Sequence, residues 1–208
     1  MKICILIPAL NEEETIGNVI TSIPNSIEGV DEIENLVVDD GSSDRTVELA
    51  RECGAIIRSH QETRGVGSAF NTGLIAALEL GSDILVNIDA DGQFSPDQIH
   101  LLISPILAGK ADFVSGDRFT YEDHKLRKPE HMSSIKFWGN QMMSRLISTM
   151  IGFRFADVSC GFRAYSKEAM LHLNLTGKFT YTQETFIDLA NKGLLILTVP
   201  VNVKYFPE

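Results

Sequence analysis

Short apolar runs alternate with helix-like spacing of apolar residues through the first half of the chain. Five runs have the length and continuity of buried strands, and they occupy residues 3–7, 33–38, 55–59, 83–88 and 111–116. Helices are expected between them: one opened by Asn11, one at about 44–53, one at about 65–80 and one opened by Ser95. This alternation predicts an α/β fold with an open, mainly parallel sheet flanked by helices.

Two of these helices carry recognisable start signals. Asn11 with Glu14 three residues later is a capping-box pattern, and Ser95 is followed by a first-turn proline and by Gln98. The helix over 65–80 is expected to turn one apolar face to the core, made of Val66, Phe70, Leu74, Ala77 and Leu78.

The second half has a different texture. Residues 119–134 are polar, charged and broken by Pro129, which predicts a mobile loop. A helix is expected over about 133–151, another over about 182–192, and a strand over 194–203. Core packing is the preferred interpretation of the apolar stripe on the helix at 133–151, although a methionine-rich face can also contact lipid or an apolar ligand. The stripe consists of Ile135, Trp138, Met142, Leu146 and Met150, widened by Met143, Ile147 and Ile151.

Length and charge narrow the classes of function. With 208 residues, the default is one compact domain. No apolar run in the sequence approaches the ~18 residues of a membrane span. The formal net charge of −10 argues against nucleic acid as a partner. The widely spaced Cys4, Cys53 and Cys160 are interpreted as reduced thiols of a cytosolic protein.

One segment reverses the overall charge. Residues 118–145 hold six basic residues against three acidic ones, a local charge of +3. Such a belt either recognises an anion or is a solvated loop, and charge alone favours neither. The basic residues are Arg118, Lys125, Arg127, Lys128, Lys136 and Arg145.

Acidic residues follow four of the predicted strands. In an open parallel sheet, ligands bind beyond the carboxyl ends of the strands, so these side chains are expected at one rim. A single acidic strand end is often only a turn or a helix cap, whereas four together favour a ligand site. The residues are Glu12 after the first strand, Asp39 and Asp40 after the second, Asp89 and Asp91 after the fourth, and Asp117 after the fifth.

Asp89 and Asp91 stand one residue apart at the end of a buried run, where like charges repel. Side chains at this spacing leave the bend on one side, within reach of a single hard cation, and Gln93 adds a neutral oxygen ligand. Mg²⁺ and Mn²⁺ commonly bind through one or two carboxylates plus substrate phosphates. The pattern therefore predicts a divalent metal at Asp89, Asp91 and Gln93.

Val37 and Asp39 are expected to face the same way at the end of the second strand. The Val37 side chain can pack against a flat ring, while the Asp39 carboxylate accepts a hydrogen bond from an N–H of that ring. A dinucleotide-binding fingerprint fits less well, because the segment at 64–73 has Gly65 and Gly67 but Phe70 in place of the third glycine, and it follows the third strand. The P-loop pattern GxxxxGK[ST] is absent from the sequence.

Six motifs together resemble family 2 glycosyltransferases of the GT-A fold, in particular the dolichyl- or polyprenyl-phosphate sugar synthases. In chain order they are IPALNEEETI, VVDDGSSDRT, RGVGSAFNTG, NIDADGQFSP, SGDRF and VSCGFRAYS. The resemblance covers nearly the whole chain. It implies one catalytic domain, with a Rossmann-like nucleotide-sugar-binding half over 1–118 and an acceptor half over 119–208. It also implies inverting transfer of a sugar from a nucleotide donor, with a divalent metal on the diphosphate.

The resemblance further implies roles for single residues. The base and ribose would lie against Pro8, Leu10, Glu12, Val37 and Asp39. The ribose and diphosphate would lie along Asp89 and Ala90, and Arg118 would face the phosphates. Asp91 and Gln93, with Asp89, would hold the metal. Asp40 is expected to brace the turn. The implied catalytic residues are Asp91, Arg118 and Glu184, with a plain helix-start acid as the alternative for Glu184. Asp157 and Arg163 border the acceptor-side motif, and a structural ion pair is the alternative for Arg163.

The leading hypothesis is a hexosyltransferase with a donor of GDP-mannose or UDP-glucose type and a polyprenyl or dolichyl phosphate acceptor. Lys125, Arg127 and Lys128 would attract the lipid phosphate, and the methionine-rich helix would meet the isoprenoid. This implies a cytoplasmic protein with peripheral contact at the cytoplasmic face of a membrane. The alternatives are a transferase with a saccharide hydroxyl acceptor and a nucleotide-binding module without turnover. Intact Asp89, Asp91 and Arg118 argue against the last.

Overall fold

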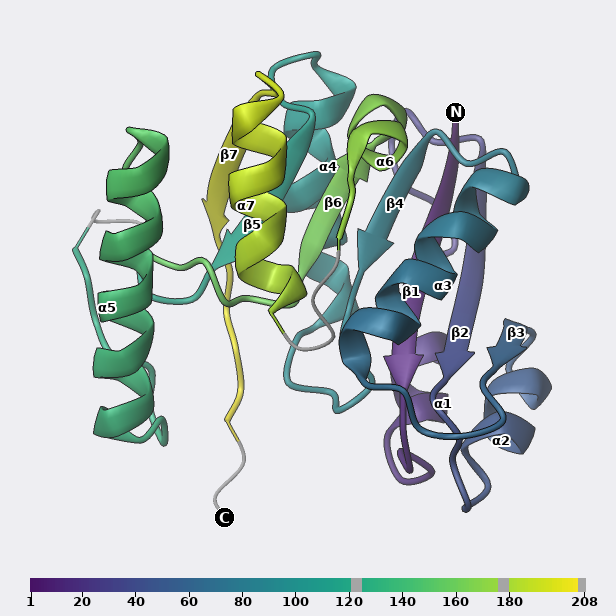
Figure 1. Ribbon diagram of the computed structural model, residues 1–208. Helices are drawn as coiled ribbons and strands as arrows, with labels where there is room; N and C mark the ends of the chain where they lie inside the picture. The colour runs from purple at the N-terminus through teal and green to yellow at the C-terminus, as the bar shows by residue number, and fades with distance from the viewer. Residues whose placement is uncertain (121–124, 176–179, 206–208) are drawn as a thin grey trace.

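The computed structural model describes residues 1–120, 125–175 and 180–205. In this part of the chain, seven strands form one open sheet in the order β3-β2-β1-β4-β6-β5-β7 (Figure 1). Every neighbouring pair is parallel except the two pairs that β6 makes with β4 and β5. The strands are β1 (Lys2–Ala9), β2 (Glu32–Asp39), β3 (Ile56–Ser59), β4 (Ile84–Asn87), β5 (Phe113–Asp117), β6 (Arg163–Ser166) and β7 (Ile196–Pro200). The predicted α/β fold with an open, mainly parallel sheet is confirmed.

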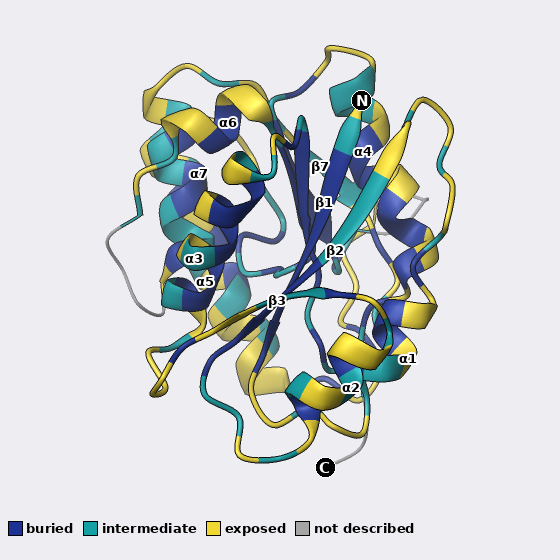
Figure 2. Ribbon diagram, turned by 90° about the vertical axis from the view of Figure 1, so that its right-hand side faces the viewer, coloured by how far each residue is buried: buried dark blue, intermediate teal, exposed yellow. Residues whose placement is uncertain are grey.

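Helices cover both faces of the sheet, and the apolar runs of the strands follow from this. In β1, Ile3, Ile5 and Ile7 belong to one buried cluster, whereas Cys4 and Leu6 belong to another on the opposite face. Figure 2 shows the central strands buried and the outer surfaces of the helices exposed. The helices are α1 (Ile16–Thr21), α2 (Thr46–Glu52), α3 (Val66–Glu79), α4 (Ile99–Leu107), α5 (Ser134–Ile151), α6 (Lys167–His172) and α7 (Tyr181–Asn191), with a 3₁₀ turn, η1, at Pro96–Gln98.

The helix start predicted at Asn11 is wrong, whereas the start at Ser95 is correct in position, with Pro96 in the first turn, but lacks a side-chain cap. Asn11 has a positive φ of 56°, and its side chain accepts a hydrogen bond from the Ser43 backbone N–H instead of capping a helix, which begins only at Ile16. After Ser95 the chain forms the 3₁₀ turn, and the Gln98 amide pairs with the backbone of Asn202. In both places a long-range partner takes the side chain that the local pattern had assigned to a cap.

Two elements and one face differ from the sequence prediction. The strand β6 and the helix α6 were not predicted, because neither has an apolar run long enough to show a period. In α3, Phe70, Leu74 and Ala77 are buried as expected, but Val66 at the first turn is exposed. The cysteines are free, with Cys4 and Cys160 buried and Cys53 partly buried.

The helix predicted over 133–151 is present as α5, but core packing of its main stripe is wrong. Met143, Ile147 and Ile151 pack toward the core cluster beside α7, whereas the five stripe residues are exposed. The helix thus has two adjacent apolar faces, and helical periodicity alone does not tell which of them meets the protein. Just before α5, Thr120 and Leu126 form an antiparallel bridge. The part of the predicted mobile loop at 121–124 lies outside the described residues.

Candidate active site

The carboxyl edge of the sheet brings acidic side chains from β1 and β4 together. The two strands are paired up to Leu6 and Asn87, and beyond them Glu12, Asp89 and Asp91 interact electrostatically. Burial, and then the charge of Asp91, raise the pKa of the Asp89 carboxyl to about 6, although Arg118 and Arg163 act in the opposite direction. Partial burial also raises the pKa values of Glu12 and Asp91. The fold therefore concentrates negative charge at this rim.

The candidate metal ligands have the right chemistry for a hard cation. Asp91 Oδ1 accepts a hydrogen bond from the Gln93 backbone N–H at 2.9 Å, which fixes the bend after β4. Among the described residues, none donates a hydrogen bond to the Asp89 carboxylate, so its oxygens remain available. Within the same ranges there is no cluster of three or more His, Cys, Asp or Glu side chains that could hold a metal. Two carboxylates and an amide suit Mg²⁺ or Mn²⁺, which takes its remaining ligands from water and phosphate.

Gly161 allows the Asp89 carboxylate to lie against the backbone. A Cβ at residue 161 would be 2.6 Å from Asp89 Oδ2 and 2.8 Å from Oδ1, closer than Cβ contacts occur. The segment before β6 therefore forms the wall behind the carboxylate, and only glycine leaves room for it. Sequence reasoning missed this residue, although it stands in the VSCGFRAYS motif.

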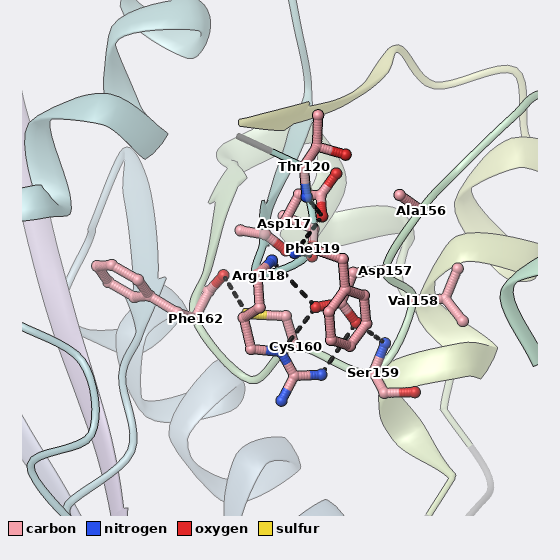
Figure 3. Close-up of polar contacts among 12 residues, drawn as sticks. Asp117, Arg118, Phe119, Thr120, Ala156, Asp157, Val158, Ser159, Cys160 and Phe162 are labelled. Atoms are coloured by element: carbon pink, nitrogen blue, oxygen red, sulfur yellow. Dashed lines mark hydrogen bonds and ion pairs between the residues drawn. The ribbon is translucent and has the colours of Figure 1, made fainter. Parts of the chain in front are cut away.

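Arg118 enters the site from the end of β5 in a bidentate ion pair with Asp157 (Figure 3). Arg118 Nε and one terminal nitrogen donate to the two Asp157 oxygens at 2.7 and 3.0 Å, and the other terminal nitrogen donates to Tyr205 Oη at 3.2 Å. The two side chains are 12% and 0% exposed. Burial alone would lower the pKa of Arg118, but Asp157 outweighs it and raises that pKa. Asp157 is thus a buried support for Arg118, and its predicted contact with the acceptor is wrong.

Arg163 is also structural. Its side chain is fully buried and donates hydrogen bonds to the backbone carbonyls of Cys160, Thr182 and Val158. Both predicted roles, an acceptor contact and an ion pair, are therefore wrong, because carbonyl oxygens take its donors. Arg163 ties the segment before β6 to the start of α7, and Gln183 adds a 3.0 Å bond to Ser159 Oγ. These bonds fix the wall that carries Gly161.

A cleft of about 610 Å³ opens between the end of β1 and the start of α3. Asp91 and Gln93 do not line it but line a separate cavity of about 330 Å³, together with residues of α1. Pro8 and Leu10, two of the predicted base contacts, line it. The structure adds the loop before α3 to this cleft, including the exposed cation Arg64, which sequence reasoning missed. The signal was the RGVGSAFNTG motif, which is part of the family resemblance but to which the sequence reasoning assigned no ligand contact. The full lining is Pro8, Ala9, Leu10, Asp40, Glu62, Thr63, Arg64, Gly65, Val66 and Ala69.

The predicted pair at the end of β2 does not line this cleft. Val37 is fully buried in the core cluster under α1 and α2, so its side chain cannot wall a base. Asp39 is nearly buried, and its Oδ1 accepts the Ser42 backbone N–H at 2.9 Å. Ala90 likewise points into the core cluster, which leaves only its backbone for a ligand contact.

Asp40 has the structural role expected of it. Its carboxylate accepts the backbone N–H groups of Arg64 and Gly65 at 2.9 and 2.8 Å, and it contacts His60 Nδ1 at 2.7 Å. Burial raises its pKa, but these hydrogen bonds lower it by more, so the net shift is downward. Asp40 therefore holds the loop that forms the far side of the cleft.

The remaining candidates lie on the acceptor side. Glu184 is in the first turn of α7 and accepts a hydrogen bond from Thr180 Oγ1. Lys125, Arg127 and Lys128 are exposed, and Lys128 Nζ donates to the Met132 carbonyl at 2.7 Å. At the end of β5, the buried Asp117 accepts the Phe119 and Thr120 backbone N–H groups, so it shapes the turn after the strand. The roles of Glu184 and the three cations stay predictions.

The family model described as Glycosyl transferase family 2 matches residues 4–173. The chain belongs to glycosyltransferase family 2. It is therefore a glycosyltransferase, and its sheet with the carboxylate rim is that of a GT-A enzyme, as the sequence motifs indicated.

Relatives of this family 2 enzyme include proteins named for lipid phosphate acceptors. The UDP-N-acetylglucosamine–dolichyl-phosphate N-acetylglucosaminyltransferase of Methanococcus voltae is 34% identical, with 98% of this chain and 86% of the relative covered. The undecaprenyl-phosphate mannosyltransferase of Micrococcus luteus is 28% identical, with 97% and 83% covered. Among solved structures, glucosyl-3-phosphoglycerate synthase of Mycobacterium tuberculosis is similar at 26% identity and a TM-score of 0.77, covering 99% of this chain and 73% of that one. A complex of that enzyme contains Mn²⁺, UDP-glucose and phosphoglyceric acid, at 25% identity and a TM-score of 0.74, covering 100% and 72%.

Proposed function

We propose that this enzyme transfers a hexose from a nucleotide sugar of GDP-mannose or UDP-glucose type to a polyprenyl or dolichyl phosphate, with a divalent metal. The observation that carries the proposal is the carboxylate pair Asp89 and Asp91, brought together with Glu12 at the carboxyl edge of the sheet, where Asp91 and Gln93 line an open cavity. The lipid phosphate acceptors named for the relatives, and the Mn²⁺ and UDP-glucose complex of the structural neighbour, support it.

The two halves of the chain take separate tasks in this proposal. Residues 1–118 bind the donor, with the base in the cleft lined by Pro8 and Leu10. Asp89, Asp91 and Gln93 are the residues that hold the metal, which stabilises the charge on the leaving diphosphate when bound. Residues 119–208 receive the acceptor. Arg118 lies between the halves, kept charged and oriented by Asp157.

The chemistry needs little from a general base. An oxygen of the lipid phosphate forms the new bond to the anomeric carbon, the bond from that carbon to the diphosphate oxygen breaks, and the nucleoside diphosphate leaves with the electron pair. Because the attacking phosphate is already an anion, no proton has to be removed from it. The work of this chain is therefore to position the two reactants and to stabilise negative charge.

Donor and metal binding can be tested by thermal unfolding with UDP, GDP, UDP-glucose and GDP-mannose, each with Mn²⁺ or with EDTA. A ligand at about 100 times its Kd stabilises the fold by about 2.7 kcal/mol, which raises Tm by roughly 5–10 °C for a chain of this size. The Asp91→Ala variant should lose the Mn²⁺-dependent part of this shift. Asp97→Ala, which removes an exposed carboxylate on η1, is the matched control and should keep it.

Transfer is tested with the nucleotide sugar that binds, offered with a polyprenyl phosphate and, separately, with phosphoglyceric acid or a free saccharide. Mass spectrometry of the products identifies the acceptor. We expect a polyprenyl phosphate sugar, absent in EDTA and with Asp91→Ala. Full activity in EDTA would refute the metal assignment, and product only on phosphoglyceric acid or saccharide would refute the acceptor.

A further inference from the structure

The helix α5 presents an apolar face that the described chain does not cover. Ile135, Trp138 and Met142 are 85%, 63% and 70% exposed, and Leu146 and Met150 continue the same face. Figure 1 shows α5 at the outer side of the molecule, beside α7, with its other side turned away from the sheet. Such a large apolar surface on one helix is unusual for a protein that faces only water and indicates an interaction surface.

The chain segment that carries this face has a charge opposite to that of the whole protein. Residues 131–156 contain no Asp or Glu, in a chain with 28 of them and a net charge of −10. Within the same stretch stand Lys136, Arg145 and Arg154, and Phe153 adds an exposed ring just after the helix. A helix with an apolar face, an aromatic residue and only basic charges has the features of one that lies in the headgroup region of a bilayer.

We propose that α5 is a membrane-docking helix that binds flat on an anionic lipid bilayer. The stripe residues enter the interface, and the cations at its border meet the lipid headgroups. The acidic remainder of the protein is repelled by the same headgroups, so the charge asymmetry turns α5 toward the membrane. Among the described residues, no helix is long and apolar enough to cross a bilayer.

A second copy of the chain fits this face less well. Two copies related by a two-fold axis would place the same acid-free stretch against itself, with like charges from Lys136, Arg145 and Arg154 at one interface. An anionic lipid surface offers the complementary charge instead.

The docking face is connected to the candidate site, and this part of the inference rests on the proposed function. Phe119, next to Arg118 in the chain, packs edge-on against Phe137 of α5 with ring centroids 5.3 Å apart, and Phe137 in turn contacts Trp138. A bilayer under α5 thus places the lipid surface near the loop that follows Arg118. A phosphate carried by a membrane lipid could then reach the site without leaving its membrane.

Trp138 is the only tryptophan of the chain, so its fluorescence reports on this face directly. The full chain is mixed with vesicles of neutral phosphatidylcholine, or of phosphatidylcholine with phosphatidylglycerol, both without polyprenyl phosphate. We expect emission to move to shorter wavelength only with the anionic vesicles, and the shift to fade as salt is added. Each cation that meets the surface strengthens binding about fivefold at low salt.

The variant Met142→Gln/Leu146→Gln keeps the reporter and should reduce vesicle binding about tenfold for each side chain, measured by flotation. Ile75→Gln/Leu171→Gln, which alters exposed apolar residues on α3 and α6, is the matched control and should bind like wild type. Circular dichroism before mixing confirms that both variants are folded.

Three results would overturn the proposal: no shift with anionic vesicles, equal binding by the two double variants, or a shift that grows with protein concentration in the absence of lipid. The last would assign the face to a second copy. A parallel transfer assay with a short, water-soluble polyprenyl phosphate separates the two proposals. If transfer persists while vesicle binding fails, only the docking surface is wrong.

Discussion

Replacing Gly161 with alanine should displace the Asp89 carboxylate while leaving the fold intact. The new Cβ would stand 2.6 Å from Asp89 Oδ2, whereas ordinary contact begins at 3.4 Å, so the carboxylate has to retreat by about 0.8 Å. The atoms that must move are the far end of a side chain, and the φ angle of Gly161 lies outside the left-handed region. We therefore expect a change in the free energy of unfolding of less than about 1 kcal/mol.

The effect on catalysis should be much larger. A misplacement of 1 Å in a catalytic site costs up to about 10²-fold in rate, so kcat/KM for hexose transfer should fall roughly 10- to 100-fold. Steady-state kinetics, calorimetry of nucleotide binding with Mn²⁺, and thermal unfolding are the three measurements. The control is Gly139→Ala on α5, where a Cβ meets no atom within 4 Å. Wild-type kcat/KM in Gly161→Ala, or a loss matched by the control, would show that the position of the Asp89 carboxylate does not limit the reaction.

Three further variants test the supports of the site by urea unfolding. Asp157→Ala leaves the buried guanidinium of Arg118 without its partner and should lower the free energy of unfolding by about 3–5 kcal/mol. The control Glu48→Ala removes one partner of an exposed pair and should cost less than about 1 kcal/mol. Equal costs would contradict a buried, oriented ion pair. Asp40→Asn should cost about 2 kcal/mol at pH 7. The folded-state pKa of Asp40 is lowered, so its stabilisation is present above about pH 4 and is lost as the pH falls through the folded pKa. The difference in unfolding free energy between wild type and Asp40→Asn should therefore shrink in acid. A difference that does not change with pH would contradict a stabilising role for the Asp40 charge. Gly73→Ala places a Cβ 2.2 Å from Leu6 Cδ1 and should destabilise by about 1–3 kcal/mol, and an unchanged midpoint would mean that β1 and α3 can separate without cost.

The strands and their acidic ends could be predicted because their signals are local. A strand buried on both faces reads as a continuous apolar run, and the core positions of Ile3 to Ile7 on alternate faces explain why this one does. The rule that ligands bind beyond the carboxyl ends then placed Asp89 and Asp91 at one rim with Glu12. No partner far along the chain had to be known for this step.

The rest depended on contacts between distant segments. Val37 and Asp39 do share a side of β2, but the sequence does not show that α1 and α2 cover that side. The pairing of Arg118 with Asp157 joins residues 39 apart, and the closeness of Gly161 to Asp89 requires β6 to enter the sheet beside β4. Local periodicity carries no information on such neighbours.

The position of β6 has a consequence for how the chain is made. β6 is the only antiparallel strand of the described sheet, and it separates β4 from β5 although it follows both in the sequence. During synthesis, the edge of β4 therefore has no neighbour until Arg163 emerges, roughly 75 residues after Asn87, which takes about 4–15 s at 5–20 residues per second. Throughout this interval the nascent chain exposes a strand edge able to pair with other chains. The segment over 1–118, to which we assign donor binding as a proposal, can therefore complete its part of the sheet only when β6 supplies the strand between β4 and β5.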